Sequence, residues 1–158
     1  MASPNEQLAL SWQQLGTNQA ELAVVFYHRL FALDPTLRTL FRNTDMPAQE
    51  RKLTAMLDAL VHGGVTTDVI AELGRRHAGY GVRPEQYAVV AEALLWSLEH
   101  TLGPRWTKAT RAVWKDVLTR VAEIMLNGAH DIDARRRRNE SPATQLGKEI
   151  KEAKPESR

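Results

Sequence analysis

The sequence predicts an all-α fold of about seven helices. Apolar residues recur three and four positions apart along most of the chain, which is the spacing that places side chains on one face of a helix. Proline and glycine divide this pattern into segments of helical length. No segment alternates apolar and polar residues in the way that a half-buried strand does. We therefore expect helices packed on helices, without a sheet.

The first two helices begin close to the N-terminus. Ser3 and Glu6 have the spacing of a capping box, in which each side chain bonds to the backbone N–H of the other residue, and Gly16 is expected to end the helix. The second helix is expected from about Asn18 to Leu33. Its predicted apolar side carries Val24, Tyr27, Leu30 and Phe31.

Two more helices are expected before the middle of the chain. Asp34 followed by Pro35 marks a helix start, because aspartate caps free backbone N–H groups and proline fits the first turn. This short helix should end near Phe41. The next helix is expected from Pro47 to the Gly63-Gly64 pair, with an apolar stripe of Gln49, Leu53, Met56, Leu57 and Leu60.

Three further helices are expected after the Gly63-Gly64 pair. Thr66 or Thr67 caps the first of them, which Gly79 and Gly81 end. Pro84 opens a long helix that Gly103-Pro104 separates from the last one. The last helix is predicted to close near Gly128, and its stripe consists of Val113, Val117, Val121, Ile124 and Met125.

The charge of the chain is concentrated at its C-terminal end. Residues 134–158 carry eight basic and four acidic side chains, whereas the remainder carries 13 basic and 15 acidic ones. We expect residues 1–130 to form one domain and residues 131–158 to form a mobile basic tail that buries too little apolar surface to be ordered. The body is close to neutral, so it is not suited to binding the phosphates of nucleic acid.

The composition also limits the class of protein. There is no cysteine, which excludes disulfides and thiolate metal sites. No stretch approaches the roughly 20 apolar residues that cross a bilayer, and the N-terminus lacks the pattern of a signal peptide. We expect a cytoplasmic protein that does not bind membranes.

His77 is the residue that raises a functional question. It continues the apolar stripe of Ile70 and Leu73, so it should point inward. A lone inward histidine is most often a core residue bonded to a carbonyl or a hydroxyl group. It cannot hold zinc alone, because zinc takes about four ligands. One imidazole does suffice for haem, because the porphyrin supplies the in-plane donors, so both interpretations stay open on the residues alone.

Four stretches in this order resemble the globins, specifically the single-domain bacterial globins related to flavohaemoglobins. They are FYHRLFALDPTLRTLF (26–41), QERKLTAML (49–57), LGRRHAGYGV (73–82) and PEQYAVVAEALL (84–95). Trp12 matches a tryptophan common in the first globin helix, and the likeness covers about residues 4–128. The resemblance implies a globin fold whose helices surround a pocket for haem b.

The resemblance assigns His77 as the proximal ligand of the iron. Its neutral Nε2 would bind the metal while Nδ1–H donates to another group, for which a carbonyl one turn back is the expected acceptor. Phe41 would stack on the porphyrin and Val82 would pack against its proximal face, while Tyr87 matches a tyrosine near the proximal histidine. Each of these three residues could instead be an ordinary core residue.

On the distal side, the resemblance matches Tyr27, Gln49 and Leu53 to a tyrosine, a glutamine and a leucine of the family. The Tyr27 hydroxyl and the Gln49 amide can both donate hydrogen bonds, which would stabilise negative charge on a bound gas. Gln49 could also be a solvated residue in the first turn of its helix. We expect the other histidines to be solvated: His28, His62, His100 and His130.

The implied function is the reversible binding of dioxygen, nitric oxide or carbon monoxide. Nitric oxide dioxygenation to nitrate is a further possibility that would need an external reductase, and no catalytic residue is assigned. Ala129 stands where the relatives carry a proximal glutamate, which argues against peroxidase-like chemistry. The alternatives are a haem-free sensor or interaction module that uses the basic tail, and a small nucleic-acid binder suggested by Arg135–Arg138.

Overall fold

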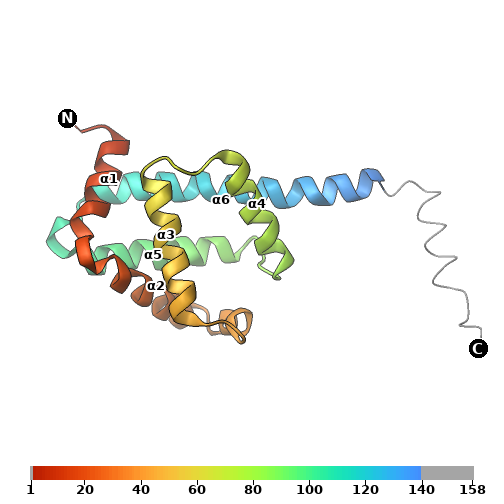
Figure 1. The fold of residues 1–158 in the computed structure, drawn as a ribbon, viewed down its shortest axis with the longest axis horizontal. Helices are drawn as coiled ribbons and strands as arrows, with labels where there is room; N and C mark the ends of the chain where they lie inside the picture. Colours follow the sequence, from red (N-terminus) through yellow and green to blue (C-terminus); the bar gives the residue numbers. More distant parts are fainter. Residues whose placement is uncertain (1, 140–158) are drawn as a thin grey trace, which may run out of the picture.

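The computed structural model describes residues 2–139, which form helices joined by short connections (Figure 1). The α-helices are α1 (Pro4–Leu15), α2 (Gln19–Leu33), α3 (Met46–Val61), α4 (Thr67–Gly79), α5 (Gln86–Leu102) and α6 (Lys108–Asn139). Three 3₁₀ segments join them: η1 (Gly16–Asn18), η2 (Pro35–Phe41) and η3 (Gly103–Arg105). No strand occurs between residues 2 and 139, so the all-α prediction is confirmed.

The helix starts follow from capping residues that the sequence shows. Ser3 and Glu6 form the complete capping box of α1, with the Glu6 N–H donating to Ser3 Oγ over 3.2 Å. Asp34 accepts from the backbone N–H of Thr36 at the start of η2, and Thr66 accepts from that of Val69 at the start of α4. These side chains satisfy N–H groups that have no partner within the helix.

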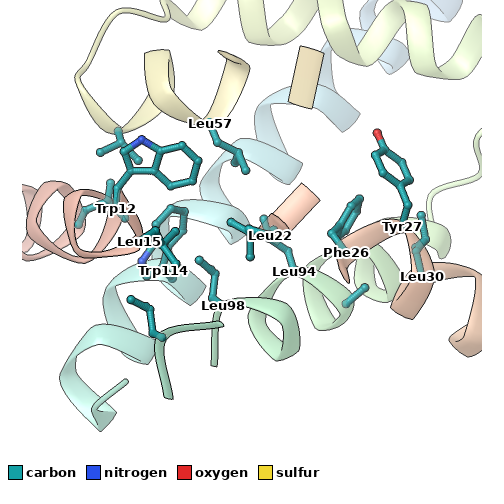
Figure 2. Packing of buried hydrophobic residues seen from close by; sticks show 14 of the residues in the cluster. Trp12, Leu15, Leu22, Phe26, Tyr27, Leu30, Leu57, Leu94, Leu98 and Trp114 are labelled. Carbon is teal, nitrogen blue, oxygen red and sulfur yellow. The ribbon is translucent and has the colours of Figure 1, made fainter. Parts of the chain in front are cut away.

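The core lies between α1, α2, α5 and α6, with α3 packed against it (Figure 2). The Trp12 and Trp114 rings are almost fully buried in it, with 6.3 Å between their centroids. Each indole N–H has a partner: Trp12 Nε1 donates to Asp58 over 2.9 Å, and Trp114 Nε1 donates to Ser11 Oγ over 2.8 Å. The two rings are therefore buried without leaving a polar group unpaired.

The inward side of α2 differs from the predicted one at a single position. Tyr27 and Leu30 are buried as predicted, but Val24 is 54% exposed. The side of α2 that packs on α5 also contains Leu22 and Phe26, which are buried. A helix buries only one stripe of its surface, and Val24 falls outside the stripe that these residues define.

The last helix is longer than predicted. We expected it to close near Gly128, whereas α6 continues without a break to Asn139. Gly128 does not end the helix, because it is a buried position at which α6 meets α4. The predicted boundary between residues 130 and 131 thus lies inside α6, and the predicted tail beyond residue 139 lies outside the described residues.

No helix in the described range has both the length and the apolar character needed to cross a membrane.

Candidate functional site

The seven residues predicted to form a site come from separate parts of the fold. Tyr27 lies on α2, Phe41 ends η2, and Gln49 with Leu53 belongs to α3. The remaining three lie on α4, in the loop that follows it and on α5: His77, Val82 and Tyr87. Tyr27 is buried and the other six are partly buried, so none of the seven is an exposed surface residue.

Tyr27 and Gln49 are brought into direct contact although 22 residues separate them. The Gln49 Nε2 donates a hydrogen bond to the Tyr27 hydroxyl, with 3.1 Å between the two atoms. Figure 2 shows that hydroxyl directed away from Leu30 on the same helix. The amide is then an orienting partner for the hydroxyl, whose own hydrogen remains available to another acceptor.

The ionisation of Tyr27 is shaped by its burial. Burial raises the pKa of Tyr27 above its ordinary value of 10.0, and the nearby Glu50 carboxylate raises it further. The hydrogen bond from Gln49 acts in the opposite direction but does not outweigh burial. The hydroxyl is therefore protonated near neutral pH and can serve as a donor.

An aromatic cluster adjoins this pair. The rings of Tyr27 and Phe41 lie edge to face with 5.5 Å between their centroids. Phe31 completes the cluster, 5.5 Å from Phe41 and 6.2 Å from Tyr27. Leu53 lies one turn after Gln49 on α3 and packs against the hydrophobic core. The predicted distal residues and Phe41 thus form one apolar region with a single hydroxyl donor at its edge.

His77 has a fixed backbone partner on its own helix. Its Nδ1 lies 2.7 Å from the carbonyl oxygen of Leu73, one turn earlier, as the sequence predicts. A carbonyl only accepts, so in the neutral ring Nδ1 carries the hydrogen. Nε2 then holds a lone pair, which is the form of imidazole that ligates a metal ion.

The turn after His77 places Val82 beside the same part of α4. The Val82 N–H donates to the His77 carbonyl over 3.0 Å, and the Gly81 N–H donates to Ala78 over 3.1 Å. These two bonds together form a common helix-ending motif, in which the residue just past the helix end has a positive φ. Here that residue is Gly81, whose φ is +91°. A β-carbon on Gly81 would lie 4.0 Å from Leu40, so η2 approaches the end of α4 here.

Tyr87 occupies the start of α5 and is partly buried. Burial raises the pKa of its hydroxyl. Among the described residues, no hydrogen bond joins Tyr87 to His77, and none joins the His77 turn to the Tyr27–Gln49 pair. The structure thus forms two groups, one around Tyr27 and one around His77. Leu40, which precedes Phe41 of the first group, approaches Gly81 beside the second.

The donor set fits haem better than a bare metal ion. No group of three or more histidine, cysteine, aspartate or glutamate side chains in the described range could hold a metal. A single imidazole with a lone pair on Nε2 meets the requirement of a cofactor that brings its own four in-plane nitrogens. The aromatic and apolar residues of the first group are compatible with the apolar faces of a porphyrin.

The other histidines and the surface grooves lack the features of this site. His28, His62, His100 and His130 are all exposed, as expected. A groove between α5 and α6 beside Trp96, and another between α1, α3 and α6, contain none of the seven predicted residues. Neither groove gathers a histidine with an aromatic cluster.

Two neighbours of the site were missed by the sequence reasoning. Phe31 contacts both Tyr27 and Phe41, and its position four residues after Tyr27 on one helical face is a signal that could have identified it. Leu40 approaches Gly81 across 41 positions of the chain, and no local pattern indicates such a contact.

Comparisons with known proteins give one consistent result. The sequence profile of the family described as Globin matches residues 24–125. Neuroglobin of Danio rerio is 33% identical over 135 residues, which cover 75% of this chain and 85% of that protein. Neuroglobin-2 of Oncorhynchus mykiss is 33% identical over 145 residues, with 78% and 91% covered.

A solved structure agrees with these sequence relatives. A Pseudomonas aeruginosa PAO1 protein, described as structurally highly homologous to a human hemoglobin, superposes with a TM-score of 0.70 at 26% identity. The match covers 80% of this chain and 98% of that one. The globin fold expected from the sequence is therefore confirmed.

Proposed function

The chain belongs to the globin family, and from this premise we propose that it holds haem b through His77 and binds dioxygen and other diatomic gases reversibly. Membership of the family indicates haem-based gas binding in general. The assignment of His77 rests chiefly on its bond to the Leu73 carbonyl, which leaves the Nε2 lone pair available to a metal ion. The flavohaemoglobin-related resemblance of the four motifs is the further support for this assignment.

His77 would fix the cofactor from one side through its Nε2. The Leu73 carbonyl prevents the ring from changing tautomer, and the Val82 bond holds the backbone of the same turn. Haem, when bound, would supply the iron that takes up the gas. Phe41 would pack against the porphyrin, whose apolar faces suit the aromatic cluster to which Phe41 belongs.

Tyr27 would be the hydrogen-bond donor for the bound gas. Its raised pKa keeps the hydroxyl protonated. Gln49 donates to the oxygen of that hydroxyl, so the hydroxyl hydrogen is left to bond to the gas. A preoriented donor stabilises a ligand that gains negative charge, because no reorganisation is needed when the charge develops. Slow release of dioxygen follows from such a donor.

The proposal is tested by gas binding in purified protein reconstituted with hemin. We expect the reduced protein to show distinct spectra under argon and under dioxygen, and to alternate between them when the gas is changed. His77→Ala should abolish this behaviour, and the exposed His28→Ala should retain it. A protein that binds no hemin would favour a haem-free interaction module.

We further propose that the protein converts nitric oxide to nitrate in the cytoplasm. Slow release of dioxygen favours reaction of the bound gas over its transport, and turnover would need an external reductase. Adding nitric oxide to the oxygenated protein should then give one nitrate per site, followed by a halt until a reductant is supplied. Nitrate below that stoichiometry would contradict nitric oxide dioxygenation.

A further inference from the structure

The helix that carries His77 is attached to the body through a close backbone crossing. In the described part of the chain, α6 is the element that packs extensively against α4, and Figure 1 shows α4 crossing it. At the crossing, a β-carbon on Gly74 would overlap the backbone oxygen of Met125. A β-carbon on Gly128 would likewise overlap the backbone oxygen of Ala71. Only glycine permits this approach from both sides.

The crossing lies close to the proposed ligand. Gly74 precedes His77 by three residues on one helix, which is about 4.5 Å along the axis at the helical rise of roughly 1.5 Å per residue. A helix moves as a stiff unit over this distance. A displacement of α4 at Gly74 therefore reaches His77 with little loss.

α4 is otherwise weakly connected to the core. Within the described range, the buried hydrophobic cluster draws its members from the other helices and from η2, and none from α4. A change at the crossing would consequently move α4 and leave the Trp12–Trp114 core in place. The overlap involves backbone atoms, so no side-chain rotation relieves it and the two helices must separate.

We propose that Gly74 and Gly128 are positioning residues that set the depth of α4 and thereby the position of His77 toward haem. This proposal rests on the proposed function for its consequence at the iron. The displacement of α4 is measured separately from any property of the iron.

The first experiment measures the position of α4 in the full chain as purified. The protein has no cysteine, so spin labels attach only at introduced sites. Leu10→Cys on α1 and Val69→Cys on α4 replace exposed residues, 51% and 47% exposed respectively. We expect Gly128→Ala to shift the distance between the labels by roughly an ångström or more, since real β-carbons need ordinary van der Waals separation.

The matched control is Gly79→Ala on the same helix. A β-carbon there would meet no atom within 4 Å, so the label distance should stay as in the parent protein. An unchanged distance in Gly128→Ala and in Gly74→Ala would overturn the positioning proposal. Loss of the fold in both variants, judged by circular dichroism, would also overturn it, because the crossing would then be a requirement of folding.

The second experiment reads the consequence at the iron. In the reduced protein without gas, Gly128→Ala should shift the iron–histidine stretching frequency and release hemin about tenfold faster. Gly79→Ala should change neither value. A shifted label distance without either change would overturn the role in haem positioning while leaving gas binding intact. Absence of hemin binding in the parent protein would instead overturn the proposed function, with the label distances still reporting on α4.

Discussion

The Gln49 side-chain amide donates a hydrogen bond to the Tyr27 hydroxyl, with 3.1 Å between Nε2 and the phenolic oxygen. The bond joins α3 to α2, and the rings of Phe31 and Phe41 lie beside it. One donor therefore orients another. Because Gln49 acts through Tyr27, substituting Tyr27 should change dioxygen release more than substituting Gln49.

Tyr27→Phe should accelerate dioxygen release. The change removes the proposed donor and retains the ring, so it deletes a hydrogen bond to a charged acceptor that is worth about 1.5–3 kcal/mol. This corresponds to a release rate at least about tenfold higher, measured by stopped-flow displacement with carbon monoxide. Tyr80→Phe is the control, because that side chain is 70% exposed. Equal release rates in Tyr27→Phe and the parent protein would exclude Tyr27 as the donor.

Gln49→Leu should accelerate release less than Tyr27→Phe does. Gln49 acts by orienting the Tyr27 hydroxyl, so its substitution leaves the donor in place but free to rotate. In Tyr27→Phe there is no hydroxyl for Gln49 to orient. The double variant should therefore release dioxygen at the rate of Tyr27→Phe alone. Strictly additive effects in this double-mutant cycle would mean that Gln49 bonds to the gas independently.

The stability of the protein should fall at alkaline pH in part through Tyr27. Its pKa in the folded state lies above the unfolded value of 10.0, because burial outweighs the hydrogen bond from Gln49. The stabilisation is thus fully present below pH 10.0 and is lost as pH rises through the folded pKa. Urea unfolding at a series of pH values should show a shallower alkaline loss for Tyr27→Phe. An unaltered slope in that variant would contradict the assignment.

Asp58→Ala should destabilise the fold by about 1–3 kcal/mol, the cost of leaving a buried donor unpaired. Asp58 accepts from Trp12 Nε1 over 2.9 Å, and the Trp12 side chain is almost fully buried. Asp58→Asn retains an acceptor oxygen and should cost less. Chemical unfolding of both variants provides the comparison, with the exposed Asp68→Ala as a control. A loss in Asp58→Asn equal to that in Asp58→Ala would show that the oxygen acceptor is unimportant.

Local features were predictable from the sequence because they depend on residues close in the chain. The capping box at Ser3, the helix end at Gly81 and the Leu73 acceptor for His77 all involve partners within five residues. The Tyr27–Gln49 pair depends on two helices, and only the resemblance to globins indicated that these residues belong together.

Long-range packing accounts for what the sequence did not predict. A glycine such as Gly128 is typical of a helix end, yet α6 continues past it. The glycine serves instead to let the backbone of α4 approach α6. Val24 was expected inside because valine is apolar, but the orientation of α2 is set by Leu22 and Phe26 against α5. Both outcomes are decided by contacts between segments that are distant in the chain.

The most direct measurement of the proposed iron ligand is the absorption spectrum of His77→Gly reconstituted with hemin, recorded with and without free imidazole. The account predicts that the spectrum of the variant differs from that of the parent protein, and that added imidazole restores the parent spectrum by taking the vacated position. A His77→Gly spectrum identical to the parent's before imidazole is added would show that another group binds the iron, and the account of this site would be wrong.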